Sequence, residues 1–188
     1  MRFNRADMVA LFRILDVRLT QPGTLRLIGG AVIGLCHLPA YRTRDIDYSW
    51  ADKEVSDALK DLQLDGKCPV PVNQTGVYFA PYDHEERFYA LKIPGLMHLT
   101  VEVPERHDLA VMKATRGIDR DIEALAQVHS VEPFDLKTLV ERFYETWTTG
   151  PRRTADLSFL IMVESLFGTE DAGRAEKMLS TLRGNGKH

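Results

Sequence analysis

The fold and the chemistry of this chain can both be inferred from residues 24–50, which read TLRLIGGAVIGLCHLPAYRTRDIDYSW. Residues 24–28 form an apolar run that is typical of a short strand, and Gly29-Gly30 follows it directly. The apolar residues 31–38 are long enough for two helical turns. Residues 44–50 alternate polar and apolar side chains, which predicts a second strand. The segment therefore predicts a strand, a glycine turn, a helix and a strand.

Two aspartates share one face of the second predicted strand. Successive side chains of a strand point to opposite faces, so Asp45 and Asp47 project together while Ile46 points into the core. Two neighbouring carboxylates repel each other unless a cation lies between them. Mg²⁺ suits such a pair, because it binds through one or two carboxylates and completes its coordination with water and substrate phosphates. The sequence therefore predicts a site for Mg²⁺, or Mn²⁺, at Asp45 and Asp47.

The glycine turn predicts a phosphate site. Gly29 and Gly30 allow a ligand to approach the backbone closely, and the start of the following helix offers N–H groups and a positive dipole end. If the two predicted strands pair, the turn and the two acids face one pocket. That arrangement favours attack on a nucleotide phosphate with two metal ions about 4 Å apart. The spacing in GGAVIG does not match the dinucleotide-binding pattern G-x-G-x-x-G.

Periodicity along the rest of the chain predicts its architecture. Apolar residues recur at helical spacing over 4–19 and 53–64, and β-rich segments follow at 76–80, 87–93 and 96–103. Beyond residue 105 the pattern is helical, near 106–129, 135–147, 154–167 and 171–183. We expect a mixed α/β (α+β) fold: a core with a mixed sheet over residues 1–104, and a C-terminal helical bundle over 105–188 that packs on it.

Composition narrows the class of protein. The chain has 188 residues, 44% of them hydrophobic, and a formal net charge of -3, which excludes disorder and argues against nucleic-acid binding through overall positive charge. Cys36 and Cys68 show no paired spacing, which indicates a reducing compartment. No run approaches the roughly 18 apolar residues that cross a bilayer. We expect a cytoplasmic protein without a membrane partner.

With these patterns, the sequence resembles the nucleotidyltransferase superfamily of polymerase-beta type. The signature of that superfamily is Gly-Gly or Gly-Ser at a helix start, followed by an acid-x-acid strand, and the sequence matches it at Gly29, Gly30, Asp45 and Asp47. RTRDID at 42–47 is most similar to the abortive-infection (AbiEii-like) branch, where an Arg and a Ser or Thr precede the acids. The resemblance implies a nucleotidyltransferase-like fold and a nucleotide contact at Arg42.

The resemblance also implies a third acid on a later strand, which binds the catalytic metal and helps to deprotonate the attacking hydroxyl. Glu102, in HLTVEV at 98–103, has apolar neighbours and fits this role. Asp83, Glu85 and Glu86 are alternatives within a polar, turn-like segment.

A further match follows in PERHDLAVMKATRGIDRDIEAL at 104–125, where relatives of the same branch carry a Lys on a helix and a basic-acid pair about eight residues later. The resemblance implies that Lys113 contacts phosphate and that Asp121 orients it, so both belong to the nucleotide-binding site. Ala124 departs from the pattern, since many relatives have another acid there.

The activity implied is that of an enzyme. Asp45, Asp47 and Glu102 would act as catalytic metal ligands in the transfer of a nucleoside monophosphate from a nucleoside triphosphate to a hydroxyl. The resemblance further implies an RNA acceptor, such as tRNA, and a role as the toxin of a toxin-antitoxin pair with a cognate antitoxin as partner. Two alternatives stay open: a catalytically weak nucleotide-binding or antitoxin-like interaction protein of the same fold, and a phosphotransferase acting on protein serine.

Overall fold

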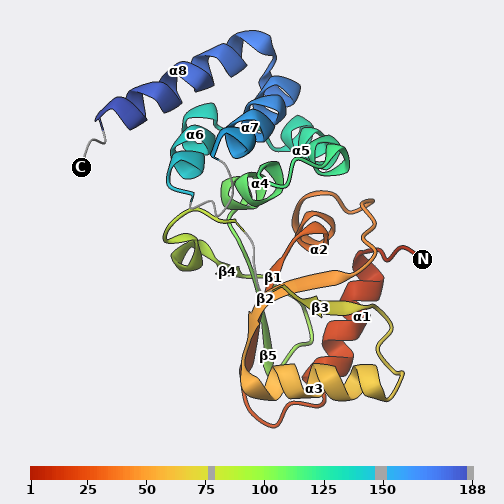
Figure 1. Ribbon diagram of the computed structural model, residues 1–188. Coiled ribbons are helices and arrows are strands. Elements are labelled where there is room, and N and C mark those ends of the chain that lie inside the picture. The colour runs from red at the N-terminus through yellow and green to blue at the C-terminus, as the bar shows by residue number, and fades with distance from the viewer. Residues whose placement is uncertain (76–78, 147–151, 186–188) are drawn as a thin grey trace. The chain divides into compact units, whose positions relative to one another are not determined.

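The computed structural model describes residues 1–75, 79–146 and 152–185, which form a five-stranded mixed sheet and eight α-helices (Figure 1). The predicted mixed α/β fold with C-terminal helices is confirmed. The chain divides into two compact units, Met1–Val77 with Arg87–Pro104, and Tyr78–Glu86 with Glu105–His188. No helix among the described ranges is both long and apolar enough for a membrane span.

The first unit is built on the sheet, whose strands lie in the order β3-β2-β1-β5-β4. The central strand β1 is antiparallel to β2 and parallel to β5; β2 and β3 are parallel, and β4 and β5 antiparallel. The strands are β1 (Gly23–Ile28), β2 (Ile46–Ala51), β3 (Val72–Gln74), β4 (Tyr89–Ala90) and β5 (Leu99–Val103).

Two amphipathic helices bury one face of this sheet. α1 (Arg5–Asp16) contacts β5, α3 (Lys53–Leu64) contacts β1, and the two helices contact each other. Leu25 and Leu27 on β1 are fully buried while Arg26 between them is partly exposed, which is the alternation of a strand with one covered face. The apolar faces of the helices complete the core with Met8, Leu11, Phe12, Leu15, Val55, Leu59 and Leu62.

The helix predicted after the glycine turn is short. Three residues form α2 (Gly30–Val32), and the chain continues as one π-helical turn over Ile33–His37. Gly34 explains the close packing here, because a Cβ at this position would lie 3.2 Å from the terminal carbon of Met8 and 3.3 Å from the carbonyl of Tyr41.

The second unit is helical. A 3₁₀ turn spans His84–Arg87, and the helices are α4 (Arg106–Ala114), α5 (Asp119–Val131), α6 (Leu136–Tyr144), α7 (Arg152–Phe167) and α8 (Thr169–Asn185). Phe143 on α6 stacks on Phe159 of α7, with ring centroids 4.1 Å apart, at the centre of the bundle. His107 joins two helix starts: its Nδ1 lies 2.7 Å from Glu105, and its Nε2 accepts the backbone N–H of Asp135.

Several predicted boundaries are wrong. The helix predicted over 106–129 is two helices, because the chain turns at 115–118, where Gly117 takes a φ of +61°. The strand predicted over 76–80 falls partly outside the described residues, and residues 79–80 are not part of any strand. The mostly polar strand β3 was not predicted, because its sequence carries no strand pattern. The later β-rich segments shorten to β4 and β5.

A buried carboxylate ties α1 to the start of β5. Asp16, 4% exposed at the end of α1, accepts the backbone N–H groups of Met97, His98 and Leu99 at 3.0, 2.8 and 2.7 Å. Burial acts to raise the pKa of Asp16, and the three backbone donors outweigh it, so the pKa lies below its ordinary value. No local sequence pattern predicts this contact, because its partners lie more than 80 positions apart in the chain.

We expect Asp16→Asn to lower the free energy of unfolding by about 1–3 kcal/mol, because the amide replaces an acceptor oxygen with a donor that faces N–H groups. Since the pKa of Asp16 is lower in the folded than in the unfolded protein, its stabilisation is present above the unfolded pKa and is lost as the pH falls through the folded pKa. Urea unfolding at a series of pH values should therefore show the largest difference between wild type and variant at pH 7, and a smaller one as the pH falls below 3.8, the ordinary value. The exposed Asp61→Asn is the matched control, and equal stability of Asp16→Asn and wild type at pH 7 would contradict this account.

Candidate active site

The glycine turn lies directly against the acidic strand. Ile28 pairs with Asp47 across the antiparallel β1–β2 ladder, so the next residue, Gly29, lies beside Asp47. Gly29 takes φ +75° and ψ -148°, a conformation that is essentially restricted to glycine. A Cβ on Gly29 would lie 2.9 Å from Oδ2 of Asp47. The backbone conformation therefore requires glycine, and any side chain at this position would have to displace the Asp47 carboxylate.

A β-bulge in this ladder sets the direction of Asp47. Trp50 pairs with Arg26 and Tyr48 pairs with Leu27, so one extra residue of β2 is accommodated between these pairs. Paired residues project to the same face, which buries Tyr48 with Leu27 and turns Asp47 to the face that carries Arg26 and Ile28. Without the bulge, the alternation would bring Asp47 to the covered face.

Asp45 lies one residue before β2 and shares the face of Asp47. Ile46 between them is fully buried, whereas both aspartates are partly exposed. Asn73 on β3 is in register with Asp47, and its Nδ2 donates a hydrogen bond of 3.2 Å to Oδ2 of Asp45. Because in-register neighbours project to one face, both carboxylates lie there, as the alternation predicted. Asn73 itself was missed, since β3 has no recognisable pattern.

Hydrogen bonds of Thr43 fix the loop that precedes Asp45. Thr43 exchanges backbone hydrogen bonds of 2.7 and 3.0 Å with Phe3, and its buried hydroxyl donates to the carbonyl of Asp45 at 2.9 Å. A Cβ on Gly30 would lie 3.0 Å from that hydroxyl oxygen, so the second glycine allows the loop to pack closely on the turn. The predicted residues Gly29, Gly30, Asp45 and Asp47 thus form one constellation.

Glu102 lies on the same sheet face but pairs with a cation. It is in register with Arg26 on β1, and Nε of Arg26 lies 2.7 Å from Oε2 of Glu102. The guanidinium also lies over the rings of Trp50 and Phe88, at 5.2 and 5.5 Å from their centroids. Glu102 and Asp47 lie on the two strands that flank β1 and are offset by two residues along it, so their backbones are roughly 12 Å apart. A metal contact at Glu102 stays a prediction.

The chemistry of the two aspartates suits a hard divalent cation. Both aspartates supply carboxylate oxygens on one partly exposed face of the sheet. Gly29 of the neighbouring turn has no Cβ, so it leaves space beside the Asp47 carboxylate. Within the described ranges, no group of three or more His, Cys, Asp or Glu side chains could hold a metal ion. Mg²⁺ is compatible with two carboxylates, because it takes its other ligands from water and phosphate.

The remaining predicted residues make other contacts. Arg42 is exposed and lines a groove beside α1. In the second unit, Nζ of Lys113 lies 2.6 Å from Asp121, and both side chains are almost completely buried. Burial lowers the pKa of Lys113 below its ordinary value, although the Asp121 carboxylate acts in the opposite direction. This pair joins α4 to α5, and its role in nucleotide binding stays a prediction. The alternative acids Asp83, Glu85 and Glu86 also belong to the second unit.

Comparison with known proteins gives the reaction class. A family model described as a nucleotidyltransferase of unknown function (DUF6036) matches residues 9–162. The chain belongs to this family. The match includes the glycine turn, both aspartates and the Lys113–Asp121 pair. No curated protein and no solved structure matches the chain significantly. Membership supports the nucleotidyltransferase superfamily and leaves the AbiEii-like branch as an expectation.

We expect Gly29→Ala to cost about 2–5 kcal/mol of the free energy of unfolding, because it adds both backbone strain and a clash with Asp47. Gly66→Ala is the matched control: Gly66 has a φ of +66°, but a Cβ there meets nothing within 4 Å. That variant should therefore lose only about 1–2 kcal/mol from strain. Guanidinium unfolding of both variants measures the difference, and equal losses would show that the turn does not press on Asp47.

Proposed function

We propose that this protein is a Mg²⁺-dependent nucleotidyltransferase that acts in the cytoplasm and moves a nucleoside monophosphate from a nucleoside triphosphate to a hydroxyl acceptor. The observation that carries this proposal is the close approach of the Gly29 backbone to Asp47, where a Cβ on Gly29 would lie 2.9 Å from Oδ2, on the face that Asp45 shares. Family membership supports the reaction class.

In this proposal, the residues of the site act mainly by position. Asp45 and Asp47 would hold the cation, and the bare backbone at Gly29 and Gly30 would let the phosphates approach these two carboxylates. A divalent metal held there would supply positive charge to offset the charge that develops on the phosphate oxygens. The acceptor oxygen bonds to the α-phosphorus as the bond to pyrophosphate breaks, and the hydroxyl proton passes to a carboxylate or to water.

Glu102 distinguishes the two leading functions. As the third acid it would complete the catalytic site, either through the oxygen that Nε of Arg26 does not contact or after this ion pair opens. If the Arg26 ion pair keeps Glu102 from the metal, the protein would bind nucleotide but turn it over slowly. The closed pair in this structure favours that second candidate, a nucleotide-binding or antitoxin-like interaction protein.

The acceptor and the biological role rest on the resemblance to the AbiEii-like branch. We take tRNA as the first acceptor to test, with other RNA next, and a cognate antitoxin as the partner of a toxin. Protein serine is the acceptor of the phosphotransferase alternative. Lys113 and Asp121 are proposed as nucleotide contacts on the same basis, as is Arg42.

Label transfer tests these functions together. The protein is incubated with Mg²⁺, total RNA and cell extract, and with each nucleoside triphosphate labelled on either the α- or the γ-phosphate. We expect α-label on RNA, and its loss by at least about 100-fold in the Asp45→Ala, Asp47→Ala variant, with Asp61→Ala as control. Transfer that persists in the double variant would remove the site assignment. Nucleotide binding without transfer would favour the second candidate, and γ-label on protein serine would favour the phosphotransferase.

Asn73→Ala should weaken binding of Mn²⁺, a spectroscopic substitute for Mg²⁺, by about 10-fold, because Asn73 orients the Asp45 carboxylate. Electron paramagnetic resonance titration of the protein with nucleotide present measures this affinity. Gln74→Ala is the control, since Gln74 is the exposed neighbour on the opposite face of β3. Equal Mn²⁺ affinity in Asn73→Ala and wild type would exclude Asn73 from the site.

A further inference from the structure

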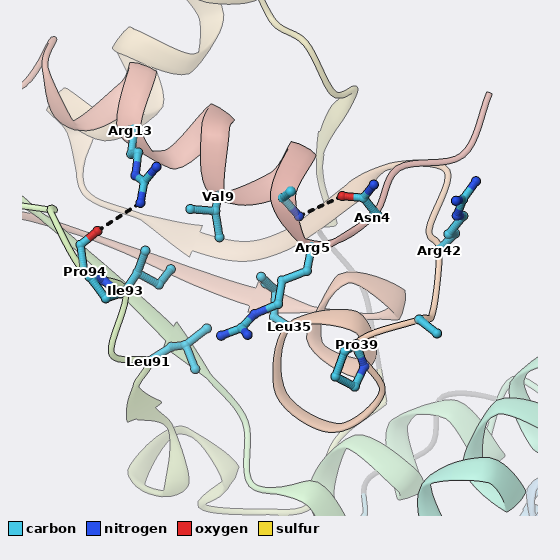
Figure 2. Close-up of a pocket in the computed structure, with 12 residues that line it drawn as sticks. Asn4, Arg5, Val9, Arg13, Leu35, Pro39, Arg42, Leu91, Ile93 and Pro94 are labelled. Atoms are coloured by element: carbon cyan, nitrogen blue, oxygen red, sulfur yellow. Dashed lines mark hydrogen bonds between the residues drawn. The ribbon is translucent and has the colours of Figure 1, made fainter.

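A groove of about 860 Å³ runs along one side of α1 in the first unit (Figure 2). Arg5, Val9 and Arg13 form its first wall; they are four residues apart and share one side of the helix. Leu91 and Ile93 form the opposite wall, two residues apart on the extended segment after β4. The groove follows α1 for about 12 Å, the length of eight helical residues.

The groove combines an apolar floor with positive charge. Eight of its twelve lining residues are apolar, and three are arginines: Arg5, Arg13 and Arg42. Figure 2 shows the guanidinium groups of Arg5 and Arg13 directed toward the opposite wall, where Arg13 donates a 3.5 Å hydrogen bond to the carbonyl of Pro94. None of the twelve described residues that line the groove is acidic. The surface is therefore complementary to a ligand that is both apolar and negatively charged.

The lining residues favour a protein segment over RNA. Single-stranded RNA gains much of its affinity by stacking bases on aromatic rings, and none of the twelve described lining residues is aromatic. Val9, Leu35, Leu91 and Ile93 instead offer contacts for aliphatic side chains. Arginine at the rim suits carboxylates, since the planar guanidinium can pair with a carboxylate through two hydrogen bonds.

We propose that this groove docks an acidic amphipathic segment of a partner protein, with aliphatic side chains on the floor and carboxylates on Arg5 and Arg13. A helix of two turns matches the length of the groove, and the pattern resembles helix-in-groove recognition. The residues that line the groove do not include Gly29, Gly30, Asp45 or Asp47, and the docking contacts proposed at Arg5, Val9 and Arg13 do not use Arg42, which is proposed as a nucleotide contact. This interaction therefore stands whether or not the protein is an active transferase.

Peptide selection tests the proposal on the full-length protein. Random 16-residue peptides displayed on phage are selected against wild type, and the enriched peptides are synthesised with a fluorophore for anisotropy titration at low and high salt. We expect a consensus that combines Leu or Ile with Asp or Glu. The Kd should rise at least 10-fold in Arg5→Ala, Arg13→Ala and in Val9→Asp, and should stay unchanged in the control Arg153→Ala, an exposed arginine of α7.

The proposal would be overturned by enriched peptides that lack acidic residues, by an affinity that the double arginine variant leaves unchanged, or by no enrichment at all. It would also be overturned if acidic peptides failed to bind while the double arginine variant lost binding to a 20-nucleotide RNA hairpin. Sedimentation of the same proteins tests whether a second copy of the chain occupies the groove, since self-association that Val9→Asp abolishes would assign the groove to a dimer.

Unfolding curves confirm that each variant is folded. The double arginine variant changes only exposed side chains, so it keeps the test available if Val9→Asp is unstable.

Discussion

The antiparallel pairing of β1 with β2 is the contact on which the candidate site depends. It places Ile28 opposite Asp47, so that the next residue, Gly29, faces the carboxylate at a separation that excludes a Cβ. The bulge in the same ladder decides which face Asp47 occupies, because one extra residue reverses the alternation beyond it. A strand pair, a bulge and a glycine thus place two carboxylates beside a bare backbone turn at one end of the central strand, which is where the proposed cation and phosphate would meet.

The acids of this protein are stabilised in different ways. Three backbone N–H groups hold Asp16, the Arg26 guanidinium holds Glu102, and the buried Lys113 ammonium holds Asp121. Asp45 receives a hydrogen bond from the neutral amide of Asn73, which orients the carboxylate without cancelling its charge. That difference makes Asp45 a better candidate for a metal cation than Glu102 and Asp121, which already pair with a basic side chain.

Local pattern was enough to predict much of this arrangement. The alternation around Ile46 placed Asp45 and Asp47 on one face, and the glycines after an apolar run predicted the turn. Prediction failed where local signals are weak or contradicted by neighbours. β3 is three residues long and mostly polar, and the continuous helical pattern at 106–129 concealed a turn that Gly117 makes possible. Pairing with β2 decides that residues 72–74 form a strand, and the positive φ of Gly117 decides where the helical segment turns. Neither property is visible in the periodicity of side chains.

The sequence by itself determined which residues could carry the chemistry, because a strand period of two and a turn that only glycine can adopt are properties of a few neighbouring positions. Only the tertiary structure decided what those residues face. Asn73 reaches Asp45 across 28 positions, Arg26 reaches Glu102 across 76, and the groove joins α1 to a segment about 80 residues later. These contacts follow from strand order and register, which are fixed by how the whole core packs and which no short stretch of sequence contains.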